Sequence, residues 1–165
     1  MRDIVLIAHN LRSIHNVGSL LRTAEGIGVS KVYLTGYTPY PQYENDSRMP
    51  HIAAKISRQM NKTALNAEHL IPWHHSDILQ PVLAGLKAGG YTIAAIEQSP
   101  TAISLPEYAA PDKIALLVGR EVEGIEPEIL AACDVILEIP MFGRKESFNV
   151  VQAAAMGLFH CRFTA

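Results

Sequence analysis

Short apolar runs alternate with helix-period patterns from one end of the chain to the other. Runs of five or six mostly apolar residues, typical of buried parallel strands, occupy residues 3–8, 31–35, 91–96, 114–119 and 135–139. Apolar positions at helical spacing occupy residues 17–28, 51–66, 76–87, 127–132 and 149–161. This order predicts an α/β domain with a mostly parallel sheet, helices on both faces, and binding sites at the carboxyl ends of the strands.

Single residues suggest where some of these elements begin. Asn16 is a suitable N-cap for the first helix, and Ser76 would cap the third. Pro127 suits the first turn of the fourth helix. Prolines and glycine make residues 36–50 a long loop, and residues 98–112 a Pro-rich connection.

The composition favours one domain spanning residues 1–165. With 165 residues, 48% of them apolar and 18% charged, the chain can bury one core but not two of ordinary size. No apolar run reaches the roughly 18 residues that span a bilayer, and the first residues lack a signal-peptide core, so we expect a cytoplasmic protein with no membrane segment. Cys133 and Cys161 show neither metal-ligand nor disulfide-framework spacing, which favours buried thiols.

The net charge of −2 conceals an asymmetry along the chain. Residues 1–62 carry eight Lys and Arg against four Asp and Glu, a net +4, whereas residues 63–165 carry six against twelve, a net −6. Basic side chains on one face could meet phosphates, and a chance scatter of solvated charges is an equally good interpretation. The cations concerned are Arg12, Arg22, Arg48, Lys55, Arg58 and Lys62.

Residues 139–151 form the most informative segment: an apolar strand end, a glycine-containing polar loop, and a helix start marked by Ser147 and Asn149. At such a junction, backbone groups released from the strand and unpaired N–H groups of the helix can hold an adenosine-like or anionic ligand. Arg144 and Lys145 add cations at the loop tip. Simple helix capping explains Ser147 and Asn149 equally well.

Two other segments carry candidate chemistry. Gly119 ends a buried strand, where it permits close backbone approach to a ligand, and Gly124 permits a sharp turn. Between them, Glu121 could orient a hydroxyl. Asn16 and Arg22 stand six positions apart at the start of the first helix, where Arg22 could grip a phosphate. A capping Asn16 and a plain surface Arg22 are the alternative.

Several common chemistries lack their motifs. No strand is followed by a P-loop or a G-x-G-x-x-G pattern, so triphosphate and dinucleotide binding lose support. No Gly-x-Ser-x-Gly elbow exists for acyl transfer. His69, His74 and His75 come nearest to a cluster, but no carboxylate or Cys joins them at a recognised ligand spacing, so we expect no metal.

Together, the three segments resemble the three motifs of the SPOUT superfamily, in the branch of tRNA and rRNA ribose 2′-O-methyltransferases. Their order, spacing and structural context all match, and the resemblance covers essentially the whole chain. The residues that carry it are Asn16, Arg22, Leu117, Val118, Gly119, Glu121, Gly124, Ile125, Ile139, Pro140, Met141, Gly143, Ser147, Phe148, Asn149 and Val150.

The resemblance implies an S-adenosylmethionine-dependent RNA methyltransferase that is a homodimer and whose C-terminal third is threaded into a deep trefoil knot, a rare exception to ordinary connection rules. The knotted loops would bind S-adenosylmethionine in a bent shape. Relatives usually have Leu where Phe148 stands, and an aromatic ring can also cover adenine. The residues expected to bind the cofactor are Ile96, Glu97, Gly119, Ile139, Met141 and Phe148.

The resemblance also assigns the chemistry at the ribose hydroxyl to Arg22. An unaided guanidinium is a poor base, so orienting a phosphate and stabilising the developing alkoxide is the sounder physical role. Across the dimer interface, Asn16, Glu121, Ser147 and Asn149 would fix Arg22 and the ligand. The residues expected to contact RNA are Arg12, Arg48, Lys55, Arg58, Arg144 and Lys145.

Many relatives carry an added RNA-binding domain, and these 165 residues include none. Substrate capture by the dimer surface favours a compact tRNA weakly over an rRNA. Two alternatives stay open: a non-catalytic knotted module that binds RNA or adenosine ligands, and an ordinary small-ligand-binding α/β domain. Marked salt dependence of RNA binding would count against the latter.

Overall fold

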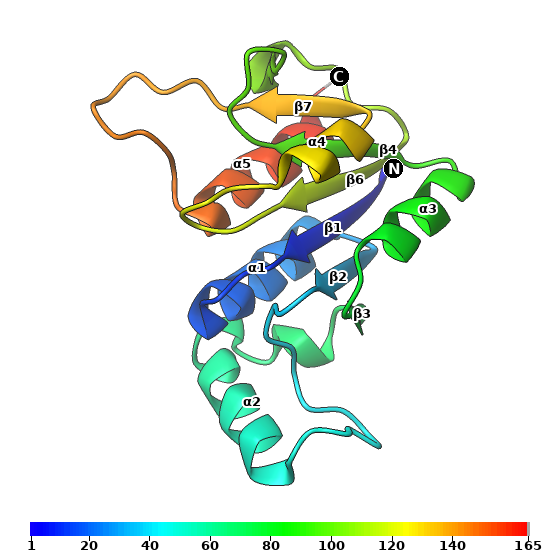
Figure 1. Cartoon of the computed structure of the whole chain (residues 1–165), viewed down its shortest axis with the longest axis vertical. Coiled ribbons are helices and arrows are strands. Elements are labelled where there is room, and N and C mark those ends of the chain that lie inside the picture. Colours follow the sequence, from blue (N-terminus) through cyan, green and yellow to red (C-terminus); the bar gives the residue numbers. More distant parts are fainter. Residues whose placement is uncertain (165) are drawn as a thin grey trace.

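The computed structural model describes residues 1–164 and has a seven-stranded sheet (Figure 1). The strands are β1 (Asp3–His9), β2 (Lys31–Thr35), β3 (Trp73–Ser76), β4 (Thr92–Ile96), β5 (Ile103–Ser104), β6 (Lys113–Val118) and β7 (Val135–Glu138). They lie in the order β3-β2-β1-β6-β4-β7-β5, and every neighbouring pair is parallel. The predicted α/β class is confirmed, and the trefoil knot stays a prediction.

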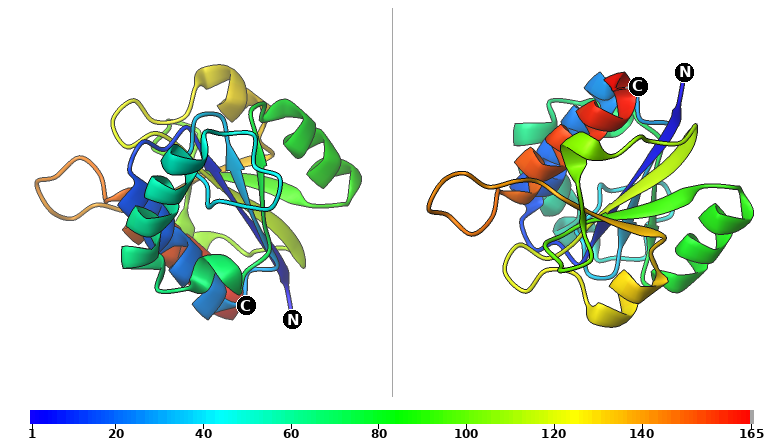
Figure 2. Two further views of the ribbon diagram at one scale, coloured as in Figure 1. Left: turned by 90° about the horizontal axis from the view of Figure 1, so that it is seen from below. Right: turned by 90° about the horizontal axis from the view of Figure 1, so that it is seen from above.

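Helices cover both faces of the sheet, as predicted (Figure 2). They are α1 (Ile14–Ile27), α2 (Pro50–Ala64), α3 (Gln80–Ala88), α4 (Pro127–Ala132) and α5 (Val150–Phe163), with 3-10 turns η1 (Ala67–His69) and η2 (Leu105–Glu107). On one face, α1 packs against both α5 and α2. On the other face lie α3 and α4 (Figures 1 and 2).

The two faces of β1 show why its sequence is apolar throughout. Ile4 and Leu6 are fully buried in the cluster that includes α1 and α5, whereas Val5 and Ile7 are buried in the cluster that includes α3 and α4. Successive side chains of a strand point to opposite faces, so a central parallel strand covered on both sides needs apolar residues at every position.

Two predicted helix starts are wrong. The N-cap of α1 is Ser13, which accepts a hydrogen bond from the Asn16 N–H at 3.2 Å, so Asn16 lies inside the first turn. Ser76 does not cap α3, which begins at Gln80. Instead Ser76 ends β3, where it pairs with Thr35, and its hydroxyl donates to the Ile78 carbonyl. Extension of the sheet overrides the local capping preference there.

The first and last described residues lie side by side. Arg2 Nη1 donates to the Cys161 carbonyl at 3.0 Å, and Arg162 Nη1 donates to the Arg2 carbonyl at 2.5 Å.

Burial raises the pKa of Cys133 and of Cys161 to about 11, which keeps both thiols protonated and unreactive. No helix among residues 1–164 combines the length and the apolar character needed to cross a membrane.

Candidate functional site

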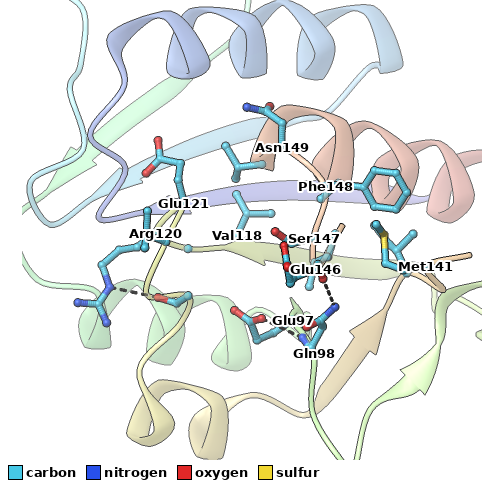
Figure 3. Close-up of a pocket in the computed structure, with 17 residues that line it drawn as sticks. Glu97, Gln98, Val118, Arg120, Glu121, Met141, Glu146, Ser147, Phe148 and Asn149 are labelled. Carbon is cyan, nitrogen blue, oxygen red and sulfur yellow. Dashed lines mark hydrogen bonds between the residues drawn. The ribbon is translucent and has the colours of Figure 1, made fainter. Parts of the chain in front are cut away.

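A cavity of about 460 Å³ opens at the carboxyl ends of β4, β6 and β7 (Figure 3). Its walls come from three segments far apart in sequence: residues 96–98, 118–124 and 139–153. Adjacent parallel strands bring their ends to one edge of the sheet, which is where such a fold places its ligands. The predicted cofactor residues Ile96, Glu97, Gly119, Ile139, Met141 and Phe148 all line this cavity.

The loop after β6 needs glycine at two positions. A Cβ at Gly119 would lie 2.4 Å from Ile125 Cγ1, far closer than atoms can pack. Gly124 has a φ of +71°, and a Cβ there would lie 2.5 Å from Glu97 Oε2. Arg120 closes the turn, because its Nε donates to the Gly124 carbonyl at 3.1 Å and its own carbonyl accepts from the Gly124 N–H at 3.2 Å. Small residues thus let this loop fold tightly over the strand ends.

Glu97 forms hydrogen bonds that stabilise the same loop. Its Oε2 accepts from the Ile125 N–H at 3.1 Å, and its Oε1 accepts from the Gln98 N–H at 2.9 Å. The carboxylate lines the cavity, but both of its oxygens are already hydrogen-bonded to backbone. Glu97 therefore holds the wall in shape, a role that the prediction of direct cofactor contact did not include.

The loop from β7 to α5 forms the opposite wall. Gln98 Nε2 donates to the Glu146 carbonyl at 2.6 Å and so ties this loop to the end of β4 (Figure 3). Asn149 is the N-cap of α5, because its side chain accepts from the Val151 N–H at 2.9 Å. Ser147 lines the cavity, and its hydroxyl forms no hydrogen bond within residues 1–164. Asn149 therefore caps α5, whereas Ser147 does not.

Glu121 lies where the cavity meets the start of α1. Its Oε1 accepts from Asn16 Nδ2 at 3.2 Å and from the Ser13 N–H at 3.4 Å, while its Oε2 accepts from the Arg12 N–H at 3.5 Å. A carboxylate at a helix N-terminus is favoured by the helix dipole and by the unpaired N–H groups there. Two of the predicted catalytic residues, Asn16 and Glu121, are thus hydrogen-bonded within one chain.

Arg22 does not reach this cavity within one chain. It is exposed on α1 and lines a separate, open depression. Its neighbours in the depression are Ser19, Thr23, Gly26, Ile27 and Thr63. Neither Arg22 nor Asn16 is among the residues that line the cofactor cavity. Of the five predicted catalytic residues, the cavity contains Glu121, Ser147 and Asn149.

The residues predicted to contact RNA differ in whether their side chains already have partners in the protein. Lys55 and Arg58 are exposed on α2, and Arg144 and Lys145 are exposed on the loop before α5. Arg12 forms an ion pair with Glu123, with 2.9 Å between Nη2 and Oε1.

Arg48 needs a correction, because it folds inward. Its Nη1 and Nη2 donate to the carbonyls of Tyr40 and Pro41, each at 3.0 Å. Its Nε donates to Asp46 at 2.9 Å, and its guanidinium lies 3.6 Å from the centroid of the Tyr40 ring. The hydrogen bonds from Arg48 hold the pKa of Asp46 down, at about 2. Arg48 therefore closes its own loop, and its donors are not available for an RNA phosphate.

The sequence interpretation missed a buried polar cluster behind the cavity. Asn10 Nδ2 donates to His9 Nε2 at 3.0 Å, so His9 Nδ1 carries the proton that bonds Thr35 Oγ1 at 2.9 Å. Burial lowers the pKa of His9, although nearby Glu126 opposes the shift. Glu126 in turn lies 3.4 Å from Arg120. No sequence motif marks this cluster, because His9 reads simply as the end of an apolar strand.

Five other cavity residues carried no prediction: Gln98, Arg120, Val122, Glu146 and Ala153. For the first four, positions next to predicted residues in the same loops were the available signal. Within residues 1–164, no three His, Cys, Asp or Glu side chains are grouped to hold a metal ion.

A family profile and several known proteins match this chain in sequence. The profile of the SpoU rRNA Methylase family matches residues 3–159. A tRNA (guanosine(18)-2'-O)-methyltransferase of Aquifex aeolicus is 25% identical over 98% of this chain and 69% of its own length. A 23S rRNA (guanosine-2'-O-)-methyltransferase, RlmB, of Neisseria meningitidis is 30% identical over 96% of this chain and 58% of its own length. The chain thus spans only part of these relatives.

The fold is also found among solved structures. An AdoMet-bound rRNA methyltransferase from Sinorhizobium meliloti superposes with a TM-score of 0.80 at 20% identity, over 97% of this chain and 56% of that one. At that identity, the likeness concerns the fold alone.

Proposed function

This chain belongs to the SpoU rRNA Methylase family, and from that premise we propose that it transfers a methyl group from S-adenosylmethionine to a ribose 2′-hydroxyl of RNA. One observation carries the proposal: the three segments that resemble the family motifs are separated in sequence, yet two of them wall one cavity and the third begins at its edge. The fold brings the strand ends to one edge of the sheet, and the motif residues are the ones that stand there.

The cavity suits an adenosine-containing cofactor. Its volume of about 460 Å³ falls in the range of small-molecule sites. Ile139, Met141 and Phe148 supply apolar surface for a base, while backbone near Gly119 and the free hydroxyl of Ser147 supply polar contacts. S-adenosylmethionine would supply an already activated methyl group, so the protein has to position the hydroxyl and assist loss of its proton.

We propose that the active unit is a homodimer and that Arg22 acts on the cavity of the second copy. Arg22 is exposed and lies outside its own chain's cavity, so a complete site needs another chain. α5, which packs beside α1, exposes Phe159 and Phe163 as a tilted aromatic pair with centroids 4.7 Å apart. Large apolar side chains exposed together favour burial against a partner.

At the reaction centre, the cationic guanidinium of Arg22 would orient an RNA phosphate and stabilise the alkoxide as it forms. Asn16 and Glu121 would hold the start of α1, and with it the approach of Arg22, through the 3.2 Å hydrogen bond between them. A compact tRNA is the substrate that we favour, captured by exposed Lys55 and Arg58 together with Arg144 and Lys145. We place the reaction in the cytoplasm.

The direct test incubates the protein with labelled S-adenosylmethionine and, separately, total tRNA and total rRNA, and then maps ribose methylation. We expect label in the tRNA pool at a ribose 2′-position. Label in neither pool would contradict a self-sufficient enzyme, and label on a base would contradict the reaction type. RNA binding should weaken steeply between low and moderate salt, because phosphate contacts release counterions.

A further inference from the structure

Phe142 is the most exposed aromatic side chain in the described part of the molecule. Its exposed fraction is 98%, whereas that of the next aromatic, Phe163, is 65%. It stands in the loop between β7 and α5, which projects from the body of the protein in both views of Figure 2. A lone exposed apolar residue needs no explanation by itself, so its surroundings decide its meaning.

Phe142 lies at the mouth of the cofactor cavity but is not part of its wall. Its neighbours on both sides, Met141 and residues 146–149, line the cavity, and Phe142 does not. The base of the loop is anchored by the hydrogen bond from Gln98 to the Glu146 carbonyl. The aromatic ring of Phe142 is therefore exposed to solvent, while the residue before it, Met141, lines the site.

The charges around Phe142 favour a nucleic acid. Arg144 and Lys145 follow it on the same loop, are exposed, and form no ion pair within residues 1–164. The one acid of the loop, Glu146, is turned to the cavity and lines it (Figure 3). An exposed ring next to two free cations is the combination that proteins use for unpaired nucleotides, with stacking on the base and ionic contact to the phosphates.

We propose that Phe142 stacks on an unpaired base of the substrate RNA while Arg144 and Lys145 contact the neighbouring phosphates. The stacked base would lie next to the nucleotide whose ribose enters the site, because the ring stands at the cavity mouth. This inference rests on the proposed RNA methyltransferase function, and it adds a substrate-positioning residue to it. It also predicts that the modified position lies in a loop or another unpaired stretch of the RNA.

The test measures binding of total tRNA and of total rRNA to the full chain in the presence of S-adenosylhomocysteine, which prevents turnover. Phe142→Ala and Phe142→Leu should lose between about fivefold and a hundredfold in affinity, because stacking is lost in both. Phe142→Tyr should keep the wild-type affinity to within about twofold. Affinity for S-adenosylmethionine and the dimer mass should stay unchanged in all three variants.

A second measurement uses fluorescence. The emission of Phe142→Trp should be quenched by RNA well beyond that of the wild type, whose only tryptophan, Trp73, is held by its hydrogen bond to the Glu68 carbonyl. Wild-type RNA affinity in Phe142→Ala would overturn the proposal. Loss of cofactor affinity in that variant would instead make Phe142 an adenine contact, and dissociation of the dimer would make it a protein contact; either result overturns it.

The two proposals fail in different ways. A wild-type chain that binds RNA and transfers no methyl group refutes the methyltransferase activity and leaves the stacking site standing. A wild-type chain that methylates RNA while Phe142→Ala binds and methylates equally well refutes the stacking site alone.

Discussion

The cofactor cavity and the surface around Arg22 differ in how much of each a single chain completes. The cavity is walled by segments bonded to one another, as in the contacts of Glu97 with Ile125 and of Gln98 with Glu146. Arg22 projects from the exposed face of α1 beside an open depression, and it forms no hydrogen bond or ion pair within residues 1–164.

Because the cavity is complete within one chain and Arg22 lies outside it, binding of the cofactor and catalysis depend on different surfaces. A chain alone holds the features needed to bind an adenosine-like molecule, whereas the arginine proposed for catalysis points elsewhere. In the homodimer that we propose, methyl transfer would require two chains, whereas cofactor binding would require one. Changes on the two surfaces should therefore have separable effects.

Removal of Arg22 should have the largest effect. Arg22→Ala should lower kcat/KM for methyl transfer by about a hundredfold or more, because the developing alkoxide loses the cation that stabilises it. Its Kd for S-adenosylmethionine should change by less than about twofold, since Arg22 lies outside the cavity. Methyl incorporation and calorimetry measure the two quantities, with Lys87→Ala, an exposed cation on α3, as the control. Unchanged turnover would remove Arg22 from the mechanism.

A methyl group placed at Gly119 should show the reverse pattern. Gly119→Ala brings a Cβ to 2.4 Å from Ile125 Cγ1, and the displaced wall should weaken S-adenosylmethionine binding by about thirtyfold, a typical cost of overpacking. Gly143→Ala is the matched control, because its Cβ would meet no atom within 4 Å. Equal cofactor affinity in the two variants, measured by calorimetry, would show that residues 119–125 do not shape the site.

Arg48 tests which basic side chains are free for RNA. Arg48→Ala should lower the free energy of unfolding by about 1.5 kcal/mol through lost hydrogen bonds, with little change in RNA affinity of the folded protein. A Lys55→Ala, Arg58→Ala double variant should weaken RNA binding several-fold at unchanged stability. Denaturant titration and filter binding separate the two outcomes. A large RNA defect in stable Arg48→Ala would restore the original RNA assignment.

Glu97 should have a smaller effect on the cavity side. Glu97→Ala removes the acceptor for the Ile125 N–H and should raise the Kd for S-adenosylmethionine by about fivefold. Glu97→Gln retains an acceptor oxygen and should lose less. If both variants instead lost all binding, the carboxylate would be a direct contact to the cofactor, as the sequence interpretation expected.

The smallest predicted effect is the pH response of His9. Its pKa in the folded protein lies below the ordinary value of 6.5, chiefly through burial, so the unfolded chain takes up a proton first. Stability from this source is complete above that ordinary value and falls as pH drops toward the folded pKa, by at most about 1.4 kcal/mol per pH unit. Thermal unfolding of the wild type and His9→Gln between pH 7 and 5 should show the difference. Identical pH profiles would exclude His9 as the source.

Periodicity predicted the elements whose residues are buried on both sides. The prediction of a strand at residues 3–8 matches β1, because a strand covered on both faces reads as a continuous apolar run. β5, at Ile103–Ser104, was missed within the Pro-rich connection because it is a two-residue edge strand with one half-buried position. The local sequence pattern does not predict such short pairing at a sheet edge.

The site was predictable where the backbone conformation requires glycine, as at Gly119 and Gly124. It was not predictable where a role depends on the path of another segment. Arg48 looked like a free cation because its acceptors are carbonyls brought to it by its own loop. Likewise, spacing alone could not reveal that Arg22 lies away from the cavity of its own chain.

The central claim is that one chain supplies the cavity and another supplies Arg22, and co-assembly of two inactive variants tests it. One chain carries Arg22→Ala, and the other carries Gly119→Val, whose larger side chain should close the cavity. Co-expression in equal amounts gives half mixed dimers with one intact site each, so methyl transfer should recover to about a quarter of the wild-type rate. Activity no greater than that of the separate variants would contradict the claim.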